Sequence, residues 1–90
     1  MRIKVERNPD RGKLTEKGVF SWPIWEKEES EFPWTYGDEE TCYFLEGDVE
    51  VTPEGGTPVE MGQGDLVVFP AGMKCTWRIR KGVRKHYRMG

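Results

Sequence analysis

The sequence predicts an all-β domain, built as a sandwich or as a jelly-roll barrel. Many short segments alternate apolar with polar residues, and glycine-containing turns separate these segments at close spacing. No stretch of about ten residues carries the apolar period of an amphipathic helix. Since no repeat, linker or low-complexity segment interrupts the 90 residues, we expect one domain over residues 1–90.

The first part of the chain contains the weaker strand signals. Ile3 and Val5 alternate with charged residues, and the segment 8–12 that follows predicts a turn. Phe20, Trp22 and Ile24 alternate next, and the proline between them indicates an edge strand or a bulge. Segment 26–31 has too few apolar residues for a helix. A third run, 32–36, predicts a strand that leads into the acidic turn 37–40.

The stronger strand signals follow in the second half. The predicted strands cover residues 41–46, 48–52, 57–61, 66–69, 75–79 and 83–89. The predicted turns lie at 54–56, 62–65, 70–72 and 80–82. Each turn contains a glycine, which supplies the positive φ that tight turns need.

Composition excludes several classes of protein. The near balance of 14 Lys and Arg against 16 Asp and Glu argues against nucleic-acid binding through bulk charge. No apolar run approaches the roughly 18 residues of a membrane span, and no signal peptide follows the first residues. Cys42 and Cys75 lack the CxxC spacing, so we expect free thiols and a cytoplasmic protein.

The small size of the chain favours a partner of the same kind. A domain of this length buries only about 60–65% of its unfolded surface, which is near the lower limit for a self-sufficient core. We therefore expect a homodimer, formed through an edge strand at residues 3–5 or 20–24.

The run from Gly64 to Gly72, Gly-Asp-Leu-Val-Val-Phe-Pro-Ala-Gly, carries a family resemblance. Its glycines and proline have the spacing of the second cupin motif, where a metal-binding histidine stands three residues after the last glycine; that position is Cys75 here. Segment 45–51 resembles the end of the first cupin motif, and Glu40 occupies the position of its metal-binding glutamate. Trp34 and Tyr36, or their neighbours Pro33 and Thr35, stand where the two histidines would be.

These residues, over roughly 19–89, make the chain similar to short single-domain cupins of the ureidoglycine aminohydrolase and ethanolamine-utilisation protein Q type. The resemblance implies an RmlC-like double-stranded β-helix, that is, a jelly-roll barrel. The aminohydrolase members hold a divalent metal with His, His, Glu and another residue and release ammonia from a ureido compound. In this chain only Glu40 carries over unchanged, so we expect no metal site and no cofactor.

Strand alternation indicates which side chains share the barrel interior. Glu40, Cys42 and Phe44 lie on one face of their strand, and Cys75, Trp77 and Ile79 on one face of theirs. In the cupin register both sets point inward. A carboxylate and two thiols would then line an aromatic cavity, and we take Trp34, Tyr36, Cys42 and Trp77 as the candidate ligand-binding residues. The alternatives are that Cys42 fills the core and that Glu40 belongs to the solvated run 38–40.

Lys85 completes the set of catalytic candidates, which are Glu40, Cys75 and Lys85. Lys85 shares a strand face with apolar residues, so it must either extend to solvent or pair with a carboxylate, and Glu40 across the cavity is the partner we consider. Such a pair would supply an acid–base couple, with Glu40 as the general base. His86, the one histidine, lies on the opposite face with Arg84 and Arg88.

Three functions remain open at this point. The chain binds a small polar metabolite in its barrel and acts on it without the His-ligated metal, or it is a non-catalytic binding or structural module. The third alternative is a metal-dependent hydrolase that uses Glu40, the two thiols and His86, although these residues lack recurrent ligand spacing. The sequence does not name the substrate.

Overall fold

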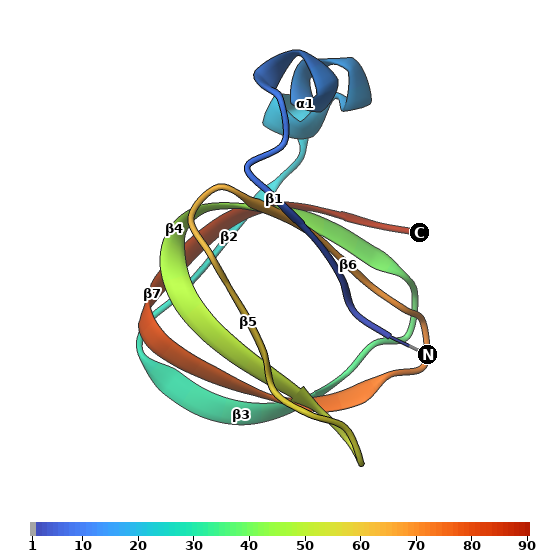
Figure 1. Ribbon diagram of the computed structural model, residues 1–90, viewed down its shortest axis with the longest axis vertical. Helices are drawn as coiled ribbons and strands as arrows, with labels where there is room; N and C mark the ends of the chain where they lie inside the picture. The colour runs from blue at the N-terminus through green and yellow to red at the C-terminus, as the bar shows by residue number, and fades with distance from the viewer. Residues whose placement is uncertain (1) are drawn as a thin grey trace.

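The strands of this protein form one antiparallel sheet that curls into a barrel, with a short helical segment at one end (Figure 1). The computed structural model describes residues 2–90. The strands are β1 Lys4–Arg7, β2 Ile24–Lys27, β3 Ser30–Thr35, β4 Glu40–Pro53, β5 Val59–Gly62, β6 Asp65–Phe69 and β7 Lys74–Met89, and the helical elements are α1 Arg11–Lys17 and the 3-10 helix η1 Val19–Ser21. The predicted all-β jelly-roll barrel is confirmed.

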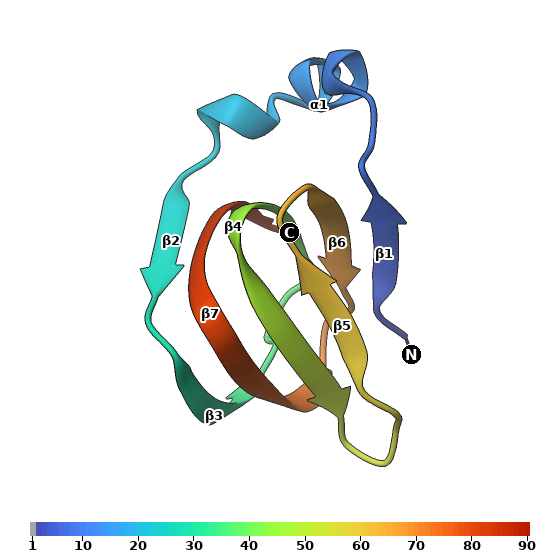
Figure 2. The same ribbon diagram turned by 60° about the vertical axis from the view of Figure 1, so that its left-hand side comes forward.

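The two long strands β4 and β7 form the centre of the sheet. The strand order is β1-β6-β4-β7-β2, with β3 paired to β7 and β5 paired to β4. Figure 2 shows β4 and β7 side by side along their length, with β5, β6 and β1 to one side and β2 to the other. The two ends of this path are β1 and β2, and β3 and β5 lie off the path with one partner each.

One predicted strand break and one predicted turn are continuous strand in the structure. We expected breaks at Gly47 and at residues 80–82, but β4 and β7 run through them and stay paired, with register shifts between Phe44 and Val49. Such bulges bend a strand without ending it. Gly47 has a φ of 128°, a conformation that is essentially restricted to glycine. The chain therefore curves around the barrel at these positions, where the sequence pattern predicted that the strands end.

The helix α1 was not predicted from the sequence. It has seven residues and buries only Leu14, so it shows no apolar period. Its ends carry the usual signals: the Asp10 side chain accepts a hydrogen bond from the backbone N–H of Gly12, and Gly18 caps the carboxyl end with a φ of 76°. No helix within residues 2–90 is long and apolar enough to cross a bilayer.

The predicted strand through Phe20, Trp22 and Ile24 is also wrong. Residues Val19–Ser21 form the 3-10 helix, and β2 begins only at Ile24. This segment and α1 pack on the outside of the barrel, where Leu14 and Val19 bury Leu66. The remaining predicted strands are confirmed with ends shifted by a few residues, and segment 26–31 is not helical.

The main core lies inside the barrel and consists of the inward-facing side chains of the central strands. Cys42 and Phe44 from β4 and Cys75, Trp77 and Ile79 from β7 are all at most 6% exposed. The alternation predicted for these two strands is therefore confirmed. Their outward neighbours are exposed or half-buried, as expected for a sheet with one buried face.

The glycine-rich motif, residues 64–72, begins in the turn between β5 and β6. Gly64 has a φ of 90°, and a Cβ there would lie 2.6 Å from the Asn8 side-chain oxygen. The next residue, Asp65, accepts a hydrogen bond from the backbone N–H of Gly62 at 2.9 Å and pairs with Arg7 at 2.6 Å. The motif thus closes a turn and ties it to β1.

We predict that Gly47→Ala destabilises the barrel by about 1–3 kcal/mol, because the added Cβ would combine an unfavourable φ with a backbone contact. That Cβ would lie 3.1 Å from the Cα of Val83. The matched control is Gly37→Ala, where the new Cβ meets nothing within 4 Å. Urea denaturation gives the free energy of unfolding of each variant, and equal values for the two variants would contradict this account.

Candidate functional site

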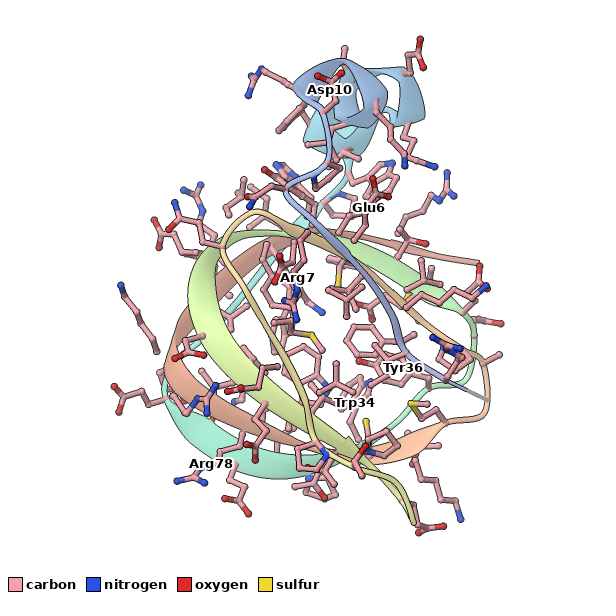
Figure 3. The ribbon with its side chains drawn as sticks, viewed as in Figure 1. Glu6, Arg7, Asp10, Trp34, Tyr36 and Arg78 are labelled. Atoms are coloured by element: carbon pink, nitrogen blue, oxygen red, sulfur yellow. The ribbon has the colours of Figure 1, made fainter. Side chains whose placement is uncertain are left out.

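A cavity of about 290 Å³ opens into the barrel between β2, β3, β4 and β7. Its lining residues are Trp25, Phe32, Trp34, Tyr36, Glu40, Trp77, Lys85, Tyr87 and Met89. Trp34 and Met89 are 48% and 45% exposed, so they mark the mouth of the cavity. Figure 3 shows Trp34 and Tyr36 within the outline of the barrel, whereas Arg78 projects from its outer side.

A buried ion pair forms the polar part of this cavity. The Lys85 Nζ donates to Glu40 Oε2 at 2.6 Å, and the two side chains are only 5% and 9% exposed. Glu40 is paired with Met89 and Lys85 with Phe44, so the two residues lie four positions apart on the inward face of the β4–β7 ladder and their side chains meet across this offset. The predicted Glu40–Lys85 pair is confirmed, and Glu40 does not belong to the solvated run.

Aromatic rings surround the ammonium group of Lys85. Its Nζ lies 4.7 Å from the ring centre of Trp77 and 5.0 Å from that of Trp25, and the rings of Phe44 and Phe69 are both at 5.8 Å. The faces of such rings are negative and attract a cation. Together with the Glu40 carboxylate, they offset much of the cost of burying a charge.

Tyr36 contributes a hydroxyl group to the same cavity. The Trp77 Nε1–H donates to the Tyr36 hydroxyl at 3.1 Å, and the Tyr36 ring stacks on Phe69 at 4.7 Å between centres. Burial raises the pKa of the Tyr36 phenol well above its usual range, and the negative charges of Glu40 and of the two cysteines would raise it further. Tyr36 is therefore a neutral phenol at physiological pH and can donate a hydrogen bond.

The two thiols do not join the cavity lining, which corrects the prediction that they share it with Glu40. Cys42 is fully buried in the core, and burial raises its pKa to about 12. The Cys75 thiol donates to the carbonyl oxygen of Trp34 at 3.6 Å, and burial raises its pKa as well. Both side chains point inward as predicted, but neither is among the residues that line the cavity.

The side chains do not fit a metal site of the kind that related cupins use. The Glu40 carboxylate faces an ammonium group, and the Cys75 sulfur faces a carbonyl. His86 lies on the outer face, where its Nδ1 donates to the Trp22 carbonyl at 2.9 Å and its ring packs edge-on to Phe20. Within the described residues, no three or more His, Cys, Asp and Glu side chains converge to hold a metal ion.

Sequence reasoning missed two aromatic walls of the cavity, Trp25 and Phe32. Trp25 lies opposite Lys85 and Phe32 opposite Trp77 in the strand register. The predicted alternation counted Trp22 and Ile24 as the apolar face, and a shift of one residue moves every side chain to the other face. For Tyr87 and Met89 a signal was present, because both share a strand face with Lys85.

Comparisons with known proteins agree with this fold. Residues 14–87 match the family model of the EutQ-like cupin domain. No curated protein matches the chain at a significant level. A crystal structure of a DUF861 family protein from Thermotoga maritima superposes with a TM-score of 0.95 at 52% sequence identity, covering 99% of this chain and 100% of that one.

Two further structures are more distant and longer. A putative ethanolamine utilization protein Q from Salmonella typhimurium is 28% identical with a TM-score of 0.64, over 71% of this chain and 51% of that one. The EutQ protein of Clostridium difficile is 26% identical with a TM-score of 0.64, over 71% of this chain and 50% of that one. By the family match and by the close Thermotoga structure, this chain belongs to the EutQ-like cupin family.

Proposed function

We propose that this cupin binds a small molecule in its barrel and that Glu40 and Lys85 form the polar end of the site. The observation that carries the proposal is the buried ion pair in the wall of an aromatic cavity of about 290 Å³. A mostly apolar pocket with a few convergent polar groups is the general form of a small-molecule site. A structural module would fill this space with its own side chains.

The same residues supply the parts for a proton transfer. Glu40 can accept a proton from a bound molecule, while Lys85 and the neutral Tyr36 hydroxyl can donate hydrogen bonds to the charge that develops. This chemistry needs no metal ligated by histidines. The relation to the ethanolamine utilization proteins covers about half of their length, so the site and not the relation supports the proposal.

Two wider predictions belong to this proposal. The free thiols Cys42 and Cys75 are consistent with a reducing compartment such as the cytoplasm.

A homodimer formed through an edge strand stays a prediction, with β1 and β2 as the ends of the strand path available for pairing. Sedimentation at micromolar concentration measures the mass of the particle, and a monomer would contradict the dimer.

We expect native mass spectrometry of the protein purified from its own cells to detect a retained small molecule. Trp34→Ala should lower the retained fraction at least several-fold, because Trp34 forms the mouth of the cavity, yet its exposure lets the fold survive the change. Phe20→Ala is the matched control, since Phe20 is also an exposed ring but lies on the outer face. Equal retention by the two variants, or no retained molecule, would argue against the proposal.

Lys85→Met should lower the free energy of unfolding by about 3–5 kcal/mol, because it leaves the Glu40 carboxylate buried without its partner. The double variant Glu40→Gln/Lys85→Met should recover most of this loss. Glu46→Gln, an exposed change on the same strand, should cost less than about 0.5 kcal/mol. Urea denaturation distinguishes these cases. A double variant no more stable than Lys85→Met would show that the two residues do not act as a pair.

The buried thiol of Cys42 gives a pH-dependent prediction. In the unfolded chain this thiol has its ordinary pKa of 9.0, and in the folded protein its pKa is about 12. Ionisation of the thiol therefore favours unfolding as the pH rises between these values. The contribution of Cys42 is complete below pH 9 and falls by about 1.4 kcal/mol per pH unit above it. Denaturation curves of the wild type and of Cys42→Ala should therefore show a steeper alkaline loss for the wild type; parallel losses would refute this assignment.

A further inference from the structure

The walls of the cavity are chiefly aromatic. Six of its nine lining residues carry rings: Trp25, Phe32, Trp34, Tyr36, Trp77 and Tyr87. Some neighbouring rings meet edge to face, with 69° between Trp25 and Trp77 and 86° between Phe32 and Trp34, whereas Phe32 and Trp77 are stacked at 13°. Ring faces and ring edges are therefore both present, and aromatic pairs prefer these offset and edge-on contacts. The volume of about 290 Å³ exceeds the roughly 150 Å³ of an engineered apolar cavity that binds benzene.

The charges in the cavity cancel. Glu40 and Lys85 are the two charged residues of the lining, and they neutralise each other at 2.6 Å. A ligand with its own charge would add a net charge to an apolar space, where taking an ion from water costs several kcal/mol unless a partner compensates it. An anion near Lys85 would meet the Glu40 carboxylate, and a cation near Glu40 would meet the ammonium group. The pair therefore disfavours both signs of charge.

Hydrogen-bond capacity remains for a neutral ligand. The Lys85 ammonium has three N–H groups; one bonds to Glu40 and a second faces the Cys42 sulfur, which leaves the third for a ligand. Within residues 2–90, no buried side-chain nitrogen or oxygen lacks a hydrogen-bond partner, so no unsatisfied group demands a charged ligand. A hydroxyl or ring nitrogen on a flat molecule could accept from Lys85 while the ring contacts the aromatic walls.

We infer that the cavity takes an uncharged planar aromatic or heteroaromatic molecule with a hydrogen-bond acceptor and rejects its carboxylate and ammonium analogues. This inference rests on the proposed function and adds the chemical class of the ligand. The carrying observation is the combination of ring-lined walls with an ion pair that is already neutral.

The test is a titration of the wild-type protein with benzyl alcohol, benzoate and benzylammonium, which share one ring and differ in charge. The readout is the set of four indole N–H signals in a nitrogen-15 correlation spectrum. Trp25, Trp34 and Trp77 line the cavity, whereas Trp22 packs on the outer face and serves as an internal control. We expect benzyl alcohol to shift the three lining signals with a Kd at least about tenfold below those of the two ions.

A charge-altered variant gives a second arm. Glu40→Gln leaves Lys85 without its counter-charge, so the preferred ligand should change to benzoate, while Glu46→Gln should keep the wild-type order. The wild-type series decides the inference even if Glu40→Gln does not fold. If benzoate or benzylammonium shifts the three lining signals and binds as tightly as benzyl alcohol, the inference that the ligand is uncharged is wrong. The proposed function is then unaffected. If no compound moves the lining signals, the aromatic class is wrong, and the retained molecule tests the proposed function separately.

Discussion

The pairing of β4 with β7 is the constraint on which the rest of the molecule depends. These two strands pair along nearly their whole length and bend at shared bulges. Every other strand except β1 pairs with one of them. Glu40 and Lys85 both lie on the inward face of this strand pair, and their side chains meet inside the barrel. The curvature of the barrel and the side chains of the cavity therefore both depend on the pairing of β4 with β7.

The ion pair explains how this barrel keeps a buried glutamate without a histidine beside it. A carboxylate in this position needs a positive partner, because an isolated buried charge costs far more than the fold can supply. In this chain the partner is the ammonium group of Lys85, held among the rings of Trp25 and Trp77. The result is a cavity with strong local dipoles and no net charge.

The inner and outer faces of the barrel carry different features. The inner face contains the cavity, the aromatic rings and the ion pair, while the outer face is covered in part by α1 and the 3-10 helix. His86 belongs to the outer set, since its ring is held by the Trp22 carbonyl. The one histidine therefore supports the packing of the amino-terminal segment and does not line the proposed site, although it directly follows Lys85.

The sequence by itself determined the all-β class and the inward sets of β4 and β7, because period-two alternation fixes which side chains share a strand face. The cupin family was indicated by the resemblance of the motif at residues 64–72. The Glu40–Lys85 pair was one of two outcomes open to a lysine on an apolar strand face, and the structure selected it. Only the tertiary structure decided the phase of β2, the helix α1 and the exclusion of both thiols from the cavity. The face that β2 presents depends on its register against β7. The helix α1 has one buried leucine and therefore no apolar period to detect. Whether a small thiol lines a cavity depends on how the large rings around it fill the space.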